Sequence, residues 1–182
     1  MKRFLKWLKI VSLLIIISLG LHIVVQGYTW KDVTALTNAL YFEGAVNESP
    51  SGLWAIASNI RNRSQNPHFP HTIAAVVADG SHGRHNGGCQ YSFMCDGLPE
   101  DPRVFETIPA RKAEMERFWG PMPYETRYRL YQIMAITFLA MGPAYDPTNG
   151  STHYWTGPRP YWFSDCLHPI IRVGNHNFCK SK

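Results

Sequence analysis

The segment from Leu40 to Arg63 constrains the fold of this chain most, because it joins two helical patterns through a short polar elbow. The first pattern places three apolar residues and one acid on one helical face: Val33, Leu36, Leu40 and Glu43. The second pattern has the i, i+3, i+4, i+7 spacing of an amphipathic helix: Leu53, Ile56, Ala57 and Ile60. We therefore expect two packed helices that hold the elbow at the edge of a groove.

Glu43 continues an apolar stripe, so its carboxylate is a candidate catalytic group. Burial disfavours the ionised form of a carboxylate, and we expect this to raise the pKa of Glu43. A general acid that works near neutral pH needs such a pKa. The alternative is an ordinary helix-end glutamate turned to solvent, and helical spacing alone favours that alternative.

The run ALYFEGAVNESPSGLWAIASNIRNR, residues 39–63, resembles the opening motif of the SleB-type cell-wall hydrolases, the family of the spore cortex-lytic enzymes. In that family an aromatic-Glu-Ala-Arg-Gly-Glu run leads into a helix ending in Asn-Arg, and the enzymes cleave the glycan strands of peptidoglycan. The resemblance implies that Glu43 is the catalytic acid and that Glu48 is a second acidic candidate. Two positions depart from the motif, with Val46 at its usual Arg and Leu53 at a common Gln.

Three later blocks of the chain are also similar to the family, so the resemblance covers most of residues 35–179 in the family's order. Cys-Gln-Tyr-Ser-Phe resembles the family's Cys-Gln-Phe-Ser-Trp, and aromatic rings, amides and hydroxyls are groups that bind sugars. Phe69-Pro70 and the Val-Val stretch after it resemble another block. The final part resembles the last one, with residues 146–155 at its turn, 160–162 at its Pro-Trp segment and 173–178 at its Ile-Gly-x-His-x-Phe run. The substrate-binding candidates are Gln90, Tyr91, Ser92, Tyr154 and His176. A lone histidine such as His176 is more often structural.

We expect an α+β fold, a mainly helical lysozyme- or transglycosylase-like domain with a small β-hairpin or sheet. Helices are predicted over residues 30–42, from an N-cap at Ser51, over 72–78 and over 124–141, with a short charged helix near 110–119. Strands are predicted over 152–155 and 171–178, the latter turning at Gly174-Asn175. The predicted core face of the helix over 124–141 is Leu130, Ile133, Met134, Thr137 and Met141.

The N-terminus is typical of a signal anchor or a signal peptide. Four cations come before the first acidic residue: Lys2, Arg3, Lys6 and Lys9. No charged residue then appears from Ile10 to Trp30, so we expect residues 1–27 to form a transmembrane helix and residues 28–182 to form the catalytic domain. The positive-inside rule places the N-terminus in the cytoplasm and the domain in the periplasm, outside the inner membrane. Val25-Gln26-Gly27 is an alternative cleavage site.

These four cations carry most of the net charge, since they leave +1 of the formal +5 for the rest of the chain. The net charge of the chain after these residues therefore does not indicate nucleic-acid binding. We expect a monomer whose partners are peptidoglycan and, through the N-terminal helix, the cytoplasmic membrane.

The four cysteines follow the apolar run, and an even number in an exported domain indicates disulfides. We expect the pairings that are local in sequence, Cys89–Cys95 and Cys166–Cys179, although spacing alone allows three connectivities. The alternative is a structural zinc site formed by His82, His85, Cys89 and Cys95, but this spacing matches no common zinc pattern. We therefore expect neither a metal nor a cofactor.

Three functions remain open on these grounds. The first is cleavage of the MurNAc-GlcNAc β-1,4 bond by a lytic transglycosylase or a muramidase, which is either a membrane-anchored phage endolysin or a bacterial wall-remodelling enzyme. The second is a non-catalytic peptidoglycan-binding module that uses aromatic rings. The third is an amidase or peptidase that cuts the peptide stems. The family motif and its acid favour the first.

Overall fold

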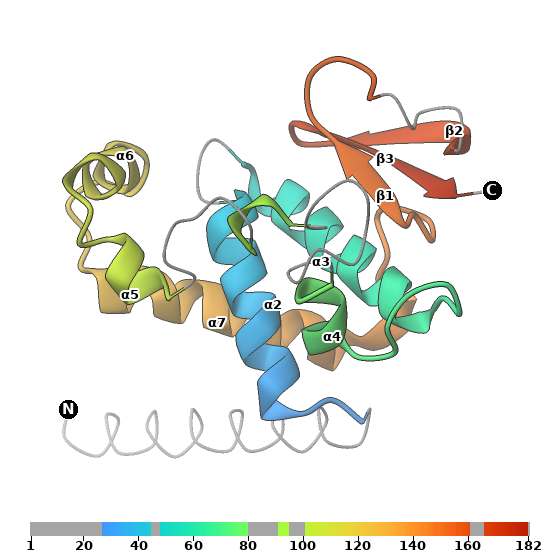
Figure 1. The fold of residues 1–182 in the computed structure, drawn as a ribbon, viewed down its shortest axis with the longest axis horizontal. Coiled ribbons are helices and arrows are strands. Elements are labelled where there is room, and N and C mark those ends of the chain that lie inside the picture. The colour runs from blue at the N-terminus through green and yellow to red at the C-terminus, as the bar shows by residue number, and fades with distance from the viewer. Residues whose placement is uncertain (1–26, 45–47, 80–90, 95–100, 161–165, 182) are drawn as a thin grey trace, which may run out of the picture.

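The computed structural model describes residues 27–44, 48–79, 91–94, 101–160 and 166–181 of the chain. Most of this part is helical, and a small antiparallel sheet lies at one end of it (Figure 1), in agreement with the expected α+β class. The predicted N-terminal membrane helix lies outside the described residues. Within the described ranges, no helix has the length and apolar character needed to cross a bilayer.

Helix α2 (Trp30–Gly44) begins with a reciprocal capping box. The backbone N–H of Thr29 donates to Oδ2 of Asp32 over 2.9 Å, and the N–H of Asp32 donates back to Oγ1 of Thr29 over 3.2 Å. The predicted apolar stripe is buried, with Leu36 and Leu40 at most 1% exposed. The helix extends through Gly44, two residues beyond its predicted end.

Helix α3 (Pro50–Gln65) begins two residues before its predicted start, because Ser49 is the N-cap and not Ser51. Oγ of Ser49 accepts a hydrogen bond from the N–H of Gly52 over 3.1 Å. Pro50 occupies the first helical position, where the missing N–H of proline has no intrahelical partner to lose. The predicted apolar face is buried as expected: Leu53, Ile56, Ala57 and Ile60.

Helix α7 (Tyr124–Met141) has its predicted bounds, but the prediction of its core face was wrong. Three residues of that face are exposed: Leu130 at 38%, Ile133 at 58% and Met141 at 40%. The buried face is Arg127, Tyr131, Ala135, Phe138 and Leu139. Arg127 tolerates burial because its guanidinium pairs with the Glu106 carboxylate and donates to the backbone carbonyl of Met122.

Short helices connect these elements: α4 (Ile73–Val77), η1 (Ser92–Met94), α5 (Pro102–Phe105), α6 (Pro109–Trp119) and η2 (Gly142–Ala144). Helix α4 lies inside the range predicted for it and is capped by Thr72. Helix α6 confirms the predicted charged helix. Helix α5 was not predicted, since four residues are too few for a periodic pattern. The Tyr41 hydroxyl of α2 donates to the Glu106 carboxylate, which ties the α5–α6 region to α2.

The sheet contains β1 (His153–Trp155), β2 (Cys166–Val173) and β3 (His176–Ser181) in the order β1-β3-β2, with both pairs antiparallel. The predicted hairpin turn is confirmed, because Val173 pairs with His176 across Gly174, whose φ is +58°. The predicted Cys166–Cys179 disulfide is present and links β2 to β3. The predicted Cys89–Cys95 pair lies outside the described residues.

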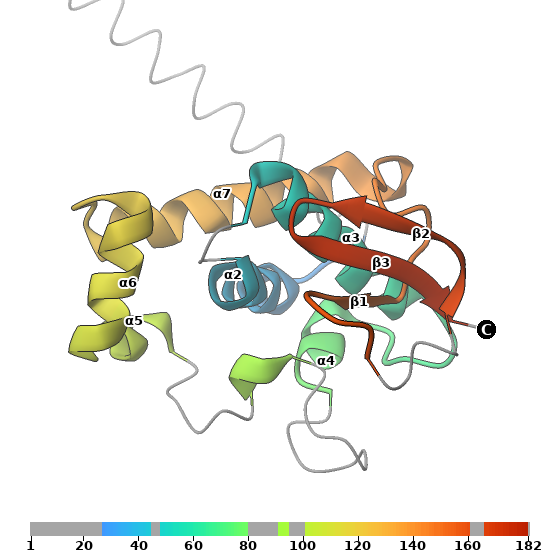
Figure 2. The same cartoon turned by 90° about the horizontal axis from the view of Figure 1, so that it is seen from above.

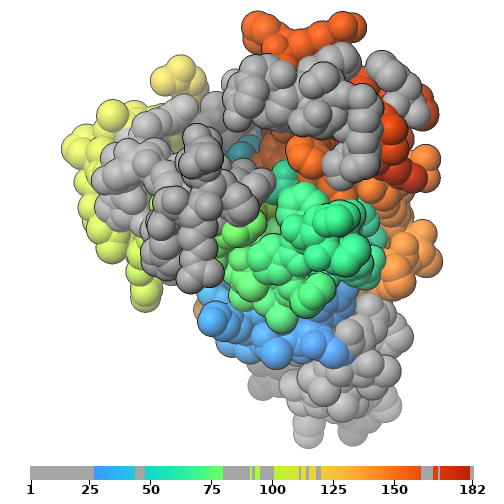
Figure 3. Space-filling view, turned by 45° about the vertical axis from the view of Figure 1, so that its right-hand side comes forward, coloured from blue at the N-terminus to red at the C-terminus, as the bar shows by residue number. Residues whose placement is uncertain are grey.

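Seen from above, the C-terminal end of α2 lies between α6 and the sheet (Figure 2). The space-filling view places the α3–α4 region between α2 and the sheet (Figure 3). Helices α2 and α3 therefore pack beside the sheet, and the C-terminal end of α2 faces residues of the sheet.

Candidate active site

Glu43 lies in the last turn of α2, where its half-buried carboxylate meets strand β1. The Tyr154 hydroxyl donates a hydrogen bond to Oε2 of Glu43 over 3.1 Å. These two residues are 111 positions apart in the sequence, so the fold alone brings them together. The apolar stripe of α2 thus ends at Glu43, whose carboxylate accepts a hydrogen bond from the Tyr154 hydroxyl.

Two tyrosine hydroxyls near Glu43 are held in their protonated form. Burial raises the pKa of Tyr154 well above its ordinary value, and the negative charge of Glu43 raises it further. Burial also raises the pKa of Tyr91, with an opposing effect from Arg63 and a further increase from Glu43. Tyr154 therefore remains a hydrogen-bond donor to Glu43 throughout the working pH range.

Arg63, in the last turn of α3, positions the strand that carries Tyr154. Its Nε donates to the backbone carbonyl of Thr152 over 2.6 Å, and its Nη1 donates to the Tyr91 hydroxyl over 3.3 Å. The guanidinium also lies over the Phe69 ring, 5.4 Å from its centroid. Glu43, Tyr91, Tyr154 and Arg63 are called the Glu43 cluster below. Arg63 was not among the residues expected at the site, although its position three residues after Ile60 extends the apolar face of α3.

Glu48, the second acidic candidate, is enclosed by Ser49, Asn175 and His176. Its side chain is 2% exposed and its Oε2 lies 2.6 Å from Nδ1 of His176. Oε1 accepts hydrogen bonds from the backbone N–H and the hydroxyl of Ser49 over 2.8 and 3.1 Å, and Oε2 accepts one from the N–H of Asn175 over 3.3 Å. Both oxygens are thus occupied by the protein, which favours a positioning role over that of the acid.

Two glycines make the space that Glu48 occupies. A Cβ at Gly52 would lie 1.8 Å from Oε1 of Glu48, and a Cβ at Gly174 would lie 1.9 Å from the same atom. The carboxylate therefore lies between the start of α3 and the β2–β3 turn, and it ties the two together.

His176 links the Glu48 site to the Glu43 cluster. Its side chain is 9% exposed, and its ring contacts the Tyr154 ring edge-on at 5.3 Å between centroids. The Tyr154 ring also stacks on Phe178 at 5.8 Å. Glu48 thus orients His176, which packs on the tyrosine that binds Glu43. Nδ1 of His176 faces Glu48, and the expectation that His176 binds substrate stays a prediction.

The remaining substrate-binding candidates differ in how exposed their side chains are. Tyr91 is 0% exposed, and its role in stacking on a sugar stays a prediction. Tyr154 is only partly buried and keeps that possibility. Gln90 and the side chain of Ser92 lie outside the described part of the chain.

No group of three histidine, cysteine or acidic side chains in the described ranges is arranged to hold a metal ion. The residues of the alternative zinc site, His82, His85, Cys89 and Cys95, lie outside those ranges.

Two solved structures are similar to this chain. The catalytic domain of the Bacillus cereus SleB protein has 24% identity and a TM-score of 0.47 over 84% of this chain and 92% of that one. The catalytic domain of the germination-specific lytic transglycosylase SleB from Bacillus anthracis has 22% identity and a TM-score of 0.49 over 85% and 98%. A search of curated proteins finds no match.

The family model for cell wall hydrolases matches residues 47–179, which is most of the chain. The matched range begins at Asn47, so it includes Glu48, Tyr154 and His176 and leaves Glu43 just outside. On the extent of this match, the chain belongs to the cell wall hydrolase family.

Proposed function

We propose that this chain cleaves the β-1,4 bond between MurNAc and GlcNAc in peptidoglycan strands, with Glu43 as the acid. The observation that carries the proposal is the contrast between the two motif glutamates. Glu43 is half-buried and bound by the Tyr154 hydroxyl, whereas Glu48 is enclosed with both oxygens bound to the protein. A group that transfers a proton to substrate must be reachable, and Glu43 meets this condition.

In the proposed mechanism Glu43 begins as a carboxylic acid. It gives its proton to the glycosidic oxygen as the bond from that oxygen to C1 of the muramic acid breaks. The resulting carboxylate accepts the hydrogen bond from Tyr154, which stabilises its charge. It then takes the proton of the muramic acid 6-hydroxyl as that oxygen bonds to C1. The product is a 1,6-anhydro end, and Glu43 regains its proton.

The engagement of Glu48 favours this transglycosylase route over hydrolysis. A muramidase needs a second carboxylate as nucleophile or base across the scissile bond. Glu48 is bound to Ser49, Asn175 and His176 and is not available for that role. If hydrolysis occurs, Asp79 is the acid to examine next, since its charge acts on the Tyr91 hydroxyl together with that of Glu43.

The test is the activity of Glu43→Gln on purified peptidoglycan, compared with Lys31→Gln, an exposed residue at the start of the same helix. Loss of a general acid is expected to lower the rate about 10²- to 10⁴-fold, while the control keeps full activity. Near-normal cleavage by Glu43→Gln would exclude Glu43 as the acid. It would favour the stem-cutting alternative, or Glu48 as the acid. A wild-type chain that binds peptidoglycan without cleaving it would favour the binding module.

We further propose that residues 1–27 hold the catalytic domain at the outer face of the cytoplasmic membrane. The four N-terminal cations and the uncharged run that follows support this proposal. The short apolar segment favours a phage lysin that leaves the bilayer over a permanently anchored bacterial enzyme. Fractionation before and after the membrane potential is dissipated tests release, and a protein that stays in the membrane fraction would contradict it.

A further inference from the structure

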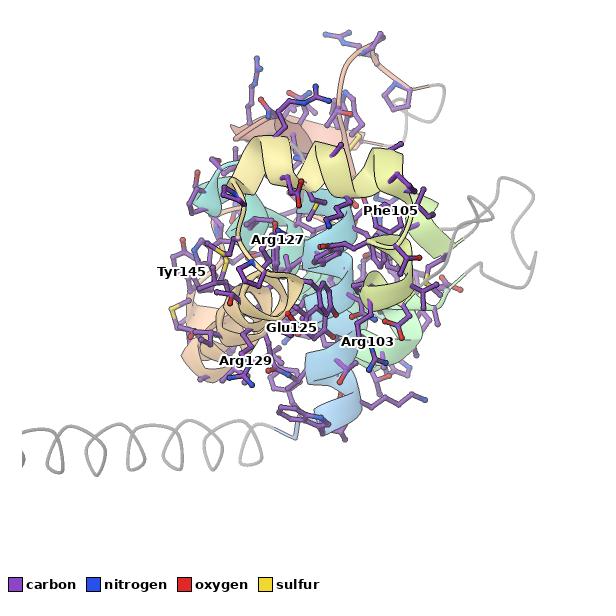
Figure 4. The ribbon with its side chains drawn as sticks, turned by 90° about the vertical axis from the view of Figure 1, so that its left-hand side faces the viewer. Arg103, Phe105, Glu125, Arg127, Arg129 and Tyr145 are labelled. Atoms are coloured by element: carbon purple, nitrogen blue, oxygen red, sulfur yellow. A yellow bond between two sulfur atoms is a disulfide. The ribbon has the colours of Figure 1, made fainter. Side chains whose placement is uncertain are left out.

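A cavity of about 630 Å³ lies on the face of the molecule formed by α2, α5 and α7, and it shares no lining residue with the Glu43 cluster. Its size is within the range of small-ligand sites. In Figure 4, Arg103 of α5 and Arg129 of α7 lie on either side of Glu125. The residues that carry the argument below are Asn38, Asp101, Arg103, Tyr124, Tyr128 and Arg129.

The cavity has an aromatic wall with an oriented amide beside it. The rings of Tyr124 and Tyr128 stack at 5.7 Å between centroids and 28° between planes. The Tyr128 hydroxyl donates to Oδ1 of Asn38 over 2.9 Å, which fixes the orientation of that amide. Ring faces pack on the C–H groups of a sugar, and amides bind its hydroxyl and acetamido groups.

The charges of the lining cancel, which disfavours an ionic ligand. Arg103 is engaged in a two-point pair with Asp101, with Nε to Oδ1 at 3.1 Å and Nη2 to Oδ2 at 2.8 Å. Arg129 is offset by Glu125, one helical turn before it on α7. A neutral ligand with many hydroxyl groups suits this lining better than a phosphate or a carboxylate.

A second cavity of about 460 Å³ adjoins the first and shares Arg103, Tyr124 and Glu125 with it. Its other charges are also paired, Arg127 with Glu106 and Lys112 with Glu116. Two neutral cavities that share Tyr124 in their lining suit an extended ligand better than a compact one.

We propose that these two cavities form a second binding site, for a neutral chain of N-acetylated amino sugars. Asn38 and Glu43 are five residues apart on α2, so they project about 140° from each other around the helix. The second site therefore holds a different stretch of glycan from the one cut at Glu43. It keeps the enzyme on the insoluble wall between cuts, and it does not depend on the chemistry at Glu43.

The binding test uses the full chain in mild detergent, with Glu43→Gln added so that the wall is not consumed. Tyr128→Ala and Asn38→Ala are compared with Tyr145→Ala, a tyrosine that is 40% exposed and lies outside both cavities (Figure 4). Retention on sedimented peptidoglycan is expected to weaken about three- to tenfold in the first two and to stay unchanged in the third. Soluble pentamers of N-acetylglucosamine are expected to remove this difference.

The proposal is overturned if Tyr128→Ala and Asn38→Ala bind as the control does, or if the neutral pentamer leaves the difference intact. Thermal unfolding of each variant shows whether it is folded. If Tyr128→Ala is unfolded, the comparison of Asn38→Ala with Tyr145→Ala tests the proposal.

A second measurement separates this site from the catalytic one. With Glu43 present, Asn38→Ala is expected to slow cleavage of intact sacculi and to leave cleavage of short soluble fragments unchanged. An equal loss of cleavage rate on intact sacculi and on short fragments would overturn the proposal of a second binding site. If the wild-type chain cleaves neither substrate, the proposed function fails, whereas the binding comparison still tests the second site.

Discussion

Replacing Glu48 by glutamine tests whether this carboxylate is a structural anchor. Glutamine has the same shape, but it puts an NH₂ donor where one carboxylate oxygen accepts hydrogen bonds. If that group replaces Oε2, it faces Nδ1 of His176 at 2.6 Å and the N–H of Asn175 at 3.3 Å. The loss of one strong hydrogen bond to a charged acceptor and of one long hydrogen bond is expected to lower the free energy of unfolding by about 2–4 kcal/mol.

For a domain of this size, that loss corresponds to a fall in Tm of roughly 5–15 °C. Calorimetry of Glu48→Gln measures it, with Glu43→Gln as the matched control. Glu43→Gln is expected to move Tm by less than about 2 °C and to lose cleavage. A Glu48→Gln variant with unchanged Tm and no activity would refute the anchor role and make Glu48 the acid.

Three further predictions concern the fold around the site. In chemical denaturation, Gly174→Ala is expected to lower the free energy of unfolding by at least about 2 kcal/mol more than Gly157→Ala does. Both glycines have positive φ, +58° and +70°, but only the Cβ at Gly174 would meet another residue, at 1.9 Å. Arg127→Ala is expected to cost about 3–5 kcal/mol, because it leaves the Glu106 carboxylate buried and unpaired, and equal stability to wild type would contradict this. Burial alone would raise the pKa of Asp146, but hydrogen bonds from Thr148, Gly150 and Asn62 lower it. Its contribution to stability is therefore full above about pH 4 and is lost as the pH falls further, so the Tm gap between wild type and Asp146→Asn should narrow below about pH 4.

Local patterns in the sequence predicted the helices well where short-range chemistry decides them. Thr29 and Asp32 form the capping box of α2, and the bounds of α7 match its proline and glycine boundaries. The start of α3 was placed two residues late because Ser49 and Ser51 both suit an N-cap. Pro50 decides between them, since proline fits the first position of the helix that Ser49 caps.

The buried face of α7 was not predictable from its own residues. Periodicity favoured the Leu130 and Ile133 face, whereas the structure buries the face of Arg127. A charged residue enters the core only with a partner, and that partner, Glu106, lies 21 residues earlier in a segment without a clear pattern.

For the site, the sequence identified Glu43 and Glu48 but could not distinguish their environments. The difference depends on Gly174 and His176, which lie more than 120 residues after Glu48 and enclose it only in the folded chain. The pairing of Cys166 with Cys179 was expected only because these cysteines are close in sequence, and the structure shows that it joins the two strands of a hairpin.

The most direct test of the central claim is mass spectrometry of the products released from purified peptidoglycan by the wild-type chain and by Glu43→Gln. We expect glycan fragments that end in 1,6-anhydromuramic acid from the wild type and almost none from the variant. Reducing-end products would contradict the transglycosylase route. Undiminished product from Glu43→Gln would contradict the assignment of Glu43 as the acid.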